Sequence, residues 1–352
     1  MKRKYTALFL ACMMLFSVSG LSGLSVFSYA ATPEFEGGSG TAEDPWQIAT
    51  AAQLSNVRNY LGTENSDKHF ILVNNIDLNV SPYNEGTGWV PIGTEGDPFT
   101  GNFDGRGFTI DGLFINDTSR WDVGLFGDLS GGSIQNVSLT NVNVTGDDYV
   151  GGVLGYSFHY DGLVKNVSVS GSVTGMDFVG GLIGDLTYGT VESSCAEVDV
   201  SGDSGAGGLL GITSGIVRNV WTTGLVSCDL GSGGLTGYNT GTVENDWVAV
   251  QVMGTEDQGG LIGRNDGFVL NSYYDSVVAG QTDTGKGEPR STAEMTYPYD
   301  STNTYIGWDF DNVWDIQSGV NSGYPFIRQQ QTEPPGEFAG GDGSEANPFQ
   351  IT

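Results

Sequence analysis

Aspartates recur in this sequence a few residues before each copy of a repeated glycine phrase. The series is Asp122, Asp148, Asp177, Asp203, Asp229 and Asp257. If the copies stack as coils of a solenoid, these carboxylates fall along one edge at about 5 Å per coil. Carboxylate oxygens are hard ligands that suit Ca²⁺. We therefore take Asp148, Asp177, Asp203 and Asp257 as candidate calcium ligands, and solvated turn residues are the alternative interpretation.

Two motifs associated with proteases indicate no active site here. Residues Gly202–Gly205 read Gly-Asp-Ser-Gly, like the nucleophile segment of trypsin-like proteases, but they occupy the turn where other copies are also acidic. A Ser-His-Asp triad needs an oriented histidine, and His69 and His159 lie in no matching motif. The chain has no His-Glu-x-x-His zinc signature. The sequence therefore predicts no catalytic residues, no cofactor beyond the candidate calcium, and a protein that is not an enzyme.

The glycine phrase that would position the aspartates reads Gly-Gly-apolar-apolar-Gly. Its closing glycines are Gly127, Gly155, Gly184, Gly211, Gly237 and Gly263, so the steps are 28, 29, 27, 26 and 26 residues. A period of this size is typical of solenoid proteins, in which each repeat forms one coil.

Two further phrases complete each repeat. The first places an Ile or Val two positions before a recurrent polar residue, in the column Asn136, Asn166, Ser193, Asn219, Asn245 and Asn271. The second alternates apolar residues, as in Val198-Asp-Val200. Three short strands per repeat describe one coil of a parallel β-helix. We expect the asparagine at a bend, with its amide bonded to the same residue one coil away.

A solenoid exposes strand edges at both ends, so it needs caps. We predict an all-β, right-handed parallel β-helix (β-solenoid) with an N-terminal helix-containing cap and an aromatic C-terminal cap. The N-terminal cap would span residues 31–98, with a helix at 50–61 and a strand at 69–78. The repeats would span 99–279, and the C-terminal closing segment 280–328.

The remaining segments indicate processing and modularity. Residues 1–30 combine a basic start, an apolar run and small closing residues, as in a secretory signal peptide. Residues 329–336 read as a linker. Residues 337–352 restate the sequence of 34–48, as the start of a second, truncated repeat unit. We expect a monomeric module of a longer chain.

The strongly acidic composition restricts the partners. The formal charge is -29, and loss of Lys2, Arg3 and Lys4 with the signal peptide makes it -29 - 3 = -32. Such a surface repels nucleic acid and anionic lipid. No other stretch is long and apolar enough to cross a bilayer. We therefore expect no nucleic-acid partner, and no membrane insertion after signal cleavage.

Together these phrases resemble the GLUG-motif proteins of bacterial and archaeal cell surfaces. The Gly-Leu-apolar-Gly core stands at 181–184, 208–211 and 260–263, with a similar lead-in at 99–110 and a similar close at 307–326. The resemblance covers residues 35–327. It implies a secreted or surface-attached, often adhesin-like protein, and it supplies no catalytic residues. Some immunoglobulin A-degrading metallopeptidases carry the motif in a non-catalytic region.

We therefore expect a secreted cell-surface structural or adhesin-like module of a larger protein. It would present a surface to an extracellular glycan or to a host or matrix protein. One alternative is a carbohydrate-active β-helix enzyme, a polysaccharide lyase or glycosidase. Another is the non-catalytic arm of a surface peptidase. Four aromatic residues are candidates either for glycan contacts or for covering the core: Tyr149, Phe178, Trp221 and Trp247.

Overall fold

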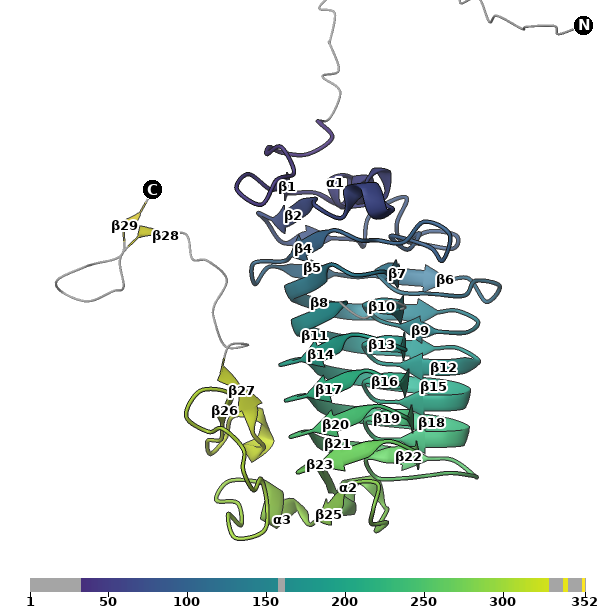
Figure 1. Ribbon diagram of the computed structural model, residues 1–352, viewed down its shortest axis with the longest axis vertical. Helices are drawn as coiled ribbons and strands as arrows, with labels where there is room; N and C mark the ends of the chain where they lie inside the picture. Colours follow the sequence, from purple (N-terminus) through teal and green to yellow (C-terminus); the bar gives the residue numbers. More distant parts are fainter. Residues whose placement is uncertain (1–32, 158–161, 329–337, 341–349, 352) are drawn as a thin grey trace, which may run out of the picture. The chain divides into compact units, whose positions relative to one another are not determined.

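The computed structural model describes residues 33–157, 162–328, 338–340 and 350–351. Within the unit Glu34–Thr352, the chain winds into stacked coils of parallel β-strands (Figure 1). The predicted all-β, parallel β-solenoid with a helix near its N-terminus is confirmed. The predicted signal peptide and linker lie outside the described residues. No helix among the described residues is long and apolar enough to span a membrane.

The coils are built from two sets of strands. One six-stranded sheet contains the strands that begin within the glycine phrase, in the order β22 (Ile262–Asn265), β19 (Thr236–Asn239), β16 (Leu210–Thr213), β13 (Ile183–Leu186), β10 (Leu154–Ser157) and β7 (Phe126–Leu129). The other sheet contains long strands that include or follow the asparagine bend: β8 (Ser133–Thr145), β11 (Leu163–Thr174), β15 (Cys195–Gly207), β18 (Trp221–Gly233) and β21 (Trp247–Met253).

Shorter strands of this second sheet complete the perimeter. They are β9 (Val150–Gly151), β12 (Asp177–Gly180), β14 (Thr190–Glu192), β17 (Ile216–Arg218), β20 (Thr242–Glu244), β23 (Phe268–Leu270) and β24 (Tyr273–Asp275). The first coils use β1 (Trp46–Ile48), β2 (His69–Leu72), β3 (Ile76–Asp77), β4 (Asn102–Asp104), β5 (Thr109–Asp111) and β6 (Phe114–Asn116).

The aliphatic column before the bend is the core of the stack. Val164 pairs with Ile134 on one side and with Val191 on the other, so equivalent residues lie directly above one another. The same register continues through Val217 and Val243. These side chains are at most 1% exposed. Burying one Val or Ile stabilises the fold by roughly 1.5–3 kcal/mol, and the column repeats this gain in every coil.

The glycine phrase sets the distance between coils. A Cβ added to Gly181 would lie 2.2 Å from the carbonyl oxygen of Gly208, and one on Gly208 would lie 2.3 Å from that of Gly234. The atoms in the way belong to the backbone, so no side-chain rotation could relieve the clash. The second glycine of the phrase is therefore required by close approach of one coil to the next.

The asparagine column forms the predicted bend. All six residues have positive φ, between 47° and 59°: Asn136, Asn166, Ser193, Asn219, Asn245 and Asn271. Asparagine tolerates this left-handed conformation better than most residues. The expected amide ladder is only partly present, because Asn166 Nδ2 donates to Asn136 Oδ1 (2.8 Å) and Ser193 then interrupts the series. Asn219 Oδ1 instead accepts from Trp314 Nε1 (3.3 Å).

The N-terminal segment covers the first coil. The predicted helix is present but shorter, as α1 (Ala51–Asn56) followed by the 3₁₀ turn η1 (Val57–Asn59), because the chain tightens after its first turns. Thr50 caps it by accepting from Gln53 N (3.3 Å). Leu54 and Val57 are fully buried. A second 3₁₀ turn, η2 (Thr63–Asn65), precedes β2, and a break after Leu72 splits the predicted strand into β2 and β3.

The aromatic C-terminal segment packs against the flank of the later coils. It comprises α2 (Ser276–Ala279), β25 (Glu288–Arg290), α3 (Thr292–Met295), β26 (Trp314–Asp315), η3 (Asn321–Gly323) and β27 (Phe326–Ile327). The ring of Trp247 stacks on Trp221 (5.3 Å) and on Tyr324 (4.7 Å). Trp221 and Trp247 are 5% and 0% exposed. Of the two roles that the sequence left open for these tryptophans, contact with glycans or burial, the structure shows burial against the C-terminal segment.

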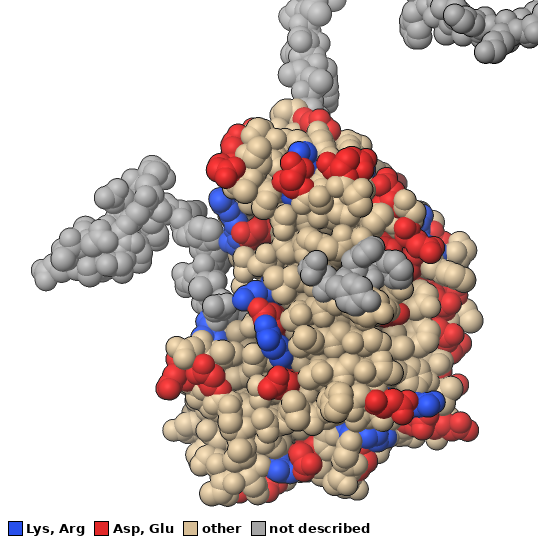
Figure 2. Space-filling view, in the orientation of Figure 1, with Lys and Arg blue, Asp and Glu red and all other residues tan. Residues whose placement is uncertain are grey.

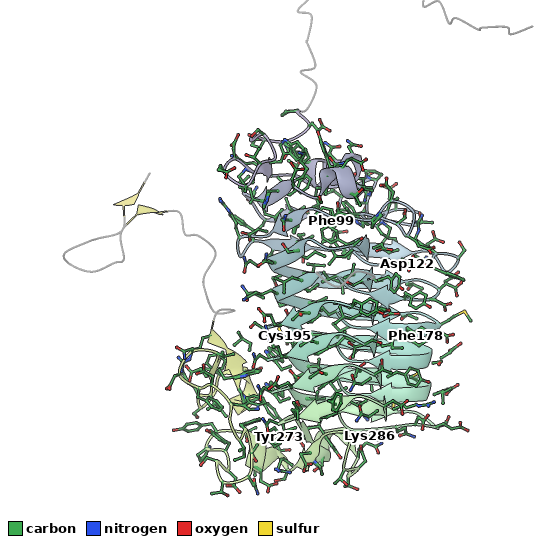
Figure 3. The ribbon with its side chains drawn as sticks, viewed as in Figure 1. Phe99, Asp122, Phe178, Cys195, Tyr273 and Lys286 are labelled. Atoms are coloured by element: carbon green, nitrogen blue, oxygen red, sulfur yellow. The ribbon has the colours of Figure 1, made fainter. Side chains whose placement is uncertain are left out.

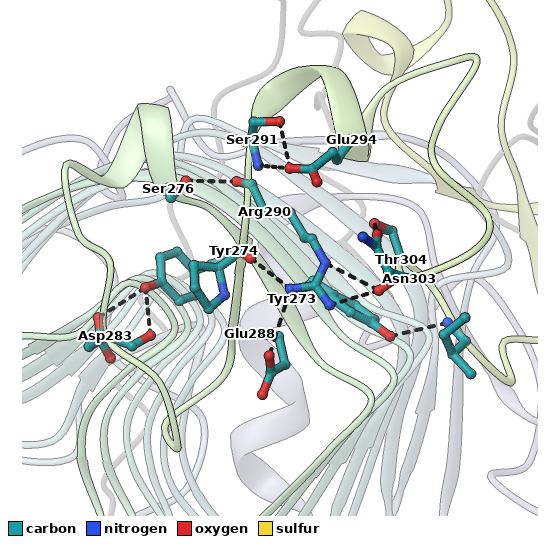
Figure 4. A network of polar contacts seen from close by, with 12 residues as sticks. Tyr273, Tyr274, Ser276, Asp283, Glu288, Arg290, Ser291, Glu294, Asn303 and Thr304 are labelled. Carbon is teal, nitrogen blue, oxygen red and sulfur yellow. Dashed lines mark hydrogen bonds and ion pairs between the residues drawn. The ribbon is translucent and has the colours of Figure 1, made fainter.

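Arg290 fastens this segment to the last coil (Figure 4). Strand β25 pairs in parallel with β24, so the beginning of the predicted C-terminal closing segment extends the stack. The Arg290 guanidinium donates to Asn303 O and lies 5.2 Å from the ring of Tyr273. Ser291 and Glu294 form a capping box at the start of α3.

The restated sequence near the C-terminus forms a similar local pairing. Strand β28 (Phe338–Gly340) pairs antiparallel with β29 (Gln350–Ile351), and Gly37 bridges Gln47 antiparallel in the first copy.

One carboxyl group is buried inside the stack. Asp246 is 0% exposed, and burial raises its pKa well above the usual value. Its Oδ1 accepts from Val220 N (2.9 Å), whereas its Oδ2 receives no hydrogen bond from the described residues. One coil away, Ser272 Oγ donates to a carbonyl two residues earlier (2.9 Å). We infer that burial keeps the Asp246 carboxyl protonated.

Replacing Asp246 by asparagine should therefore stabilise the protein above neutral pH. The folded-state pKa of Asp246 is raised, so its stabilising effect is complete below the unfolded pKa and is lost as pH rises through the folded pKa. The amide of the Asp246→Asn variant keeps an oxygen that accepts from Val220 N, and it does not titrate. At pH 8 we expect this variant to have a higher unfolding free energy than the parent chain, and at pH 4 to differ little from it. Denaturant unfolding measures this, and a variant that is less stable at every pH would contradict it.

Candidate functional site

The acidic turns lie where each long strand passes into the glycine phrase. We call this surface the turn edge, and define it as residues 120–123, 146–150, 175–179, 202–206, 228–232 and 254–258. Asp122 and Phe178 lie on it, on the same side of the stack (Figure 3), and acidic side chains gather along it (Figure 2).

A left-handed residue makes the turn in every coil. The residues concerned are Asp122, Tyr149, Phe178, Gly205, Gly231 and Asp257, with φ between 50° and 73°. Glycine and aspartate adopt this conformation readily, whereas for an aromatic residue it costs about 1 kcal/mol or more. The rings of Tyr149 and Phe178 stack at 5.4 Å with an 11° interplanar angle, and this contact holds the two turns in place.

The four candidate calcium ligands do not fall into one row. Asp148 and Asp177 share a register position, because Val150 pairs with Val179. Asp177 pairs with Ser204, so Asp203 stands one position earlier. Ser204 pairs with Leu230 and Leu230 with Glu256, so Asp257 stands one position later. Among the described residues no group of three or more His, Cys, Asp or Glu side chains is arranged to hold a metal ion. The structure therefore brings together only Asp148 and Asp177.

The carboxylates of the turn edge nevertheless interact. Burial first, and then the negative charges of Asp148, Asp203 and Asp147, raise the pKa of Asp177. Asp148 Oδ1 accepts from Asp177 N (3.2 Å), and Asp147 Oδ2 accepts from Trp121 Nε1 (3.1 Å). Within residues 33–157 and 162–328, no ion pair includes any of these aspartates. The turn edge thus holds negative charge that its own coils leave unneutralised.

A second group of carboxyls was missed by the sequence analysis. Asp128 on β7 and Asp185 on β13 are 2% and 8% exposed, and burial raises the pKa of each to about 7. Burial also raises the pKa of Asp122 to about 6. Tyr156 lies between Asp128 and Asp185 in the register. Each of the two aspartates directly follows the closing glycine, and this position was the available signal. A carboxyl that is partly protonated at neutral pH is able to donate a proton.

The asparagine bend carries a contrasting, neutralised surface. A cavity of about 430 Å³ opens there between the coils and the C-terminal segment, lined by residues that include Lys165, Glu192 and Arg218. Lys165 Nζ lies 2.7 Å from Glu192 Oε1, and Arg218 Nε donates to Glu192 Oε2 at 2.8 Å. These charges satisfy one another across three coils, which indicates a structural role.

One repeat matches a known motif. Residues 146–174 match the family model described as the GLUG motif. The chain contains a GLUG motif. The match covers one coil, from the turn at Gly146 through β11, and the coils that follow repeat its register.

Two longer proteins are similar to part of this chain. A protein of Evansella cellulosilytica provisionally named Gly-rich membrane protein is 43% identical over 139 residues, covering 38% of this chain and 15% of that protein. Halomucin of Haloquadratum walsbyi is 39% identical over 159 residues, covering 43% of this chain and 2% of that protein. The matched region is thus a small part of either relative.

A solved structure shares the fold. It is a Bacteroides ovatus protein provisionally named immunoglobulin A1 protease, with a crystal structure at 1.30 Å resolution. The TM-score is 0.62 at 20% sequence identity, and the match covers 84% of this chain and 95% of that one. At this identity the likeness establishes the β-solenoid fold alone.

Calcium titration tests whether the turn edge holds a specific metal site. Because the carboxylates lie out of register, we expect Ca²⁺ and Mg²⁺ at equal concentration to raise the melting temperature of the chelator-treated chain by the same small amount, through screening. Differential scanning calorimetry measures both shifts. A shift specific to Ca²⁺, and lost in Asp148→Asn, would instead establish the calcium site that the sequence suggested.

Proposed function

We propose that this chain is a structural and adhesive module of a larger surface protein, and that it presents the turn edge to extracellular ligands. The observation that carries the proposal is the in-register stack, in which equivalent turns recur along one edge from β7 to β22. In such an array each coil contacts only its neighbours, so surface positions repeat at a fixed spacing. This arrangement suits a stalk on which one weak binding surface is repeated many times.

The relatives support a location at the cell surface. One is named as a membrane protein and the other as a halomucin, and both are far longer than the region they share with this chain. A strongly acidic surface, with a formal charge of -29, keeps such an exposed protein soluble. We place the protein outside the cell or on its surface, as a non-catalytic part of a longer assembly.

The buried carboxyls favour one alternative. Asp122, Asp128 and Asp185 have raised pKa values, and Asp128 and Asp185 lie on the same sheet with one strand, β10, between them. Paired acids with raised pKa values are a feature of glycosidases. The second candidate function is therefore a carbohydrate-active β-helix enzyme. The register positions of Asp128 and Asp185 are filled in later coils by Ile212 and Arg264, so the carboxyls occur only at the start of the stack.

Display on a cell tests the adhesive role. The full chain would be fused to the cell-wall anchor of a Gram-positive host and exposed to surfaces coated with matrix proteins or glycans under flow. We expect at least one coating to retain about tenfold more cells than the anchor alone, because repeated weak contacts act together.

Two outcomes would contradict the proposal. One is retention equal to that of the anchor alone on every coating, while an antibody detects the chain on the cell. The other is release of reducing ends or unsaturated products from glycans by the purified chain, abolished in Asp185→Asn. The second outcome would establish the enzymatic alternative.

A further inference from the structure

We propose that the turn edge binds a basic, partly apolar segment of another extracellular protein, rich in Lys or Arg. This inference rests on the proposed surface function and names the chemistry of the partner. It follows from three properties of the turn edge: exposed apolar side chains in alternate coils, uncompensated negative charge, and an acidic residue in every coil.

Large apolar side chains are exposed on this edge in several coils. Trp121 is 60% exposed, Met176 51% and Leu230 37%. Such side chains, rimmed by polar residues, are typical of protein interaction surfaces, in which tryptophan and methionine are enriched. Solubility alone does not explain exposed apolar side chains in an acidic turn. The apolar component therefore points to a partner that buries part of this surface.

The charges beside these side chains favour a cationic partner. The indole of Trp121 donates to Asp147, so an aromatic face and a carboxylate stand next to each other. An ammonium or guanidinium group gains from both, through a cation–π contact and an ion pair. The only basic residue among 120–123 is Arg120, and its Nε already lies 3.3 Å from Asp117 Oδ2.

Like-charge repulsion on the edge is a further argument. The pKa of Asp177 is raised partly by three neighbouring carboxylates, so these groups destabilise one another in the free protein. A basic segment would relieve that repulsion on binding. An acidic segment or an acidic glycan would be repelled. A neutral glycan would donate hydroxyl groups to the carboxylates but would leave their negative charge uncompensated.

The repeated groups of the turn edge determine how it would recognise a partner. Adjacent coils lie about 4.8 Å apart, so an acidic residue recurs along the edge at that spacing. The exposed apolar side chains Trp121, Met176 and Leu230 stand in alternate coils. A Lys- or Arg-containing segment would therefore find equivalent contacts at several positions. Binding should be tolerant of the partner's sequence, sensitive to salt, and strengthened by apolar residues in the partner.

Peptide binding tests the proposal. The probes would be fluorescein-labelled synthetic peptides of equal length, one alternating Lys and Leu, one alternating Lys and Ser, and one alternating Glu and Leu, with a neutral cello-oligosaccharide as a glycan probe. Fluorescence anisotropy and calorimetry with the full chain would measure affinity at low salt and at about 0.5 M NaCl. We expect the Lys-Leu peptide to bind most tightly, to weaken in salt, and the Glu-Leu peptide not to bind.

Charge-matched variants locate the site. The edge variant replaces three acids by amides, which keep their hydrogen-bond acceptors: Asp147→Asn, Asp148→Asn and Asp177→Asn. The control removes the same charge from exposed positions outside the edge: Glu43→Gln, Glu85→Gln and Asp311→Asn. We expect the edge variant to weaken Lys-Leu binding about tenfold and the control less than about twofold. Trp121→Ser should weaken the Lys-Leu peptide more than the Lys-Ser peptide.

Three results would overturn the proposal. The first is no binding of either basic peptide, and the second is equal weakening by the edge and control variants, which would mean diffuse attraction to a polyanion. The third is binding of the cello-oligosaccharide that is lost in Trp121→Ser, which would make the edge a glycan surface. Any of these results would reject the basic-segment proposal alone. The proposed surface function is tested separately, by the retention of displayed cells under flow.

Discussion

The structure depends on how closely one coil can approach the next. The second glycine of the phrase faces the backbone carbonyl of the same glycine in the following coil at four positions, Gly152, Gly181, Gly208 and Gly234. A side chain at any of them would keep the coils apart. Only at that short distance can the strands of successive coils share hydrogen bonds and their aliphatic residues stack. The GLUG phrase is thus explained by packing, and its two apolar residues by burial.

The same constraint decides where function can lie. Inward positions are taken by the core and glycine positions by inter-coil contact, so only bends and outward positions are free to differ. At the asparagine bend the outward charges neutralise one another, as Glu192 does with Lys165 and Arg218. At the turn edge the charges are mostly acidic and are accompanied by exposed apolar side chains. Of these two repeated surfaces, the second retains unsatisfied interactions.

The sequence predicted the features that follow directly from the repeat period. The pairing of Val164 with Ile134 and Val191, and the left-handed bend at Asn166, follow from the repeat. It could not predict contacts between distant segments. The outward position of Trp247 looks the same whether it meets solvent or a residue 78 positions later, and it meets Pro325. Nor could it place Asp203 and Asp257, because a turn that shifts by one residue moves a carboxylate out of register.

The most direct test of this account compares two Gly→Ala substitutions by denaturant unfolding. In the Gly208→Ala variant the added methyl group would lie against the carbonyl of Gly234. In the Gly96→Ala variant, at an exposed position, it would meet no atom within 4 Å. Overpacking of this kind costs about 1–3 kcal/mol or more. The account predicts that Gly208→Ala lowers the unfolding free energy by at least about 2 kcal/mol, while Gly96→Ala leaves it unchanged or slightly raised. Equal stability of the two variants would contradict the claim that glycine sets the spacing of the coils.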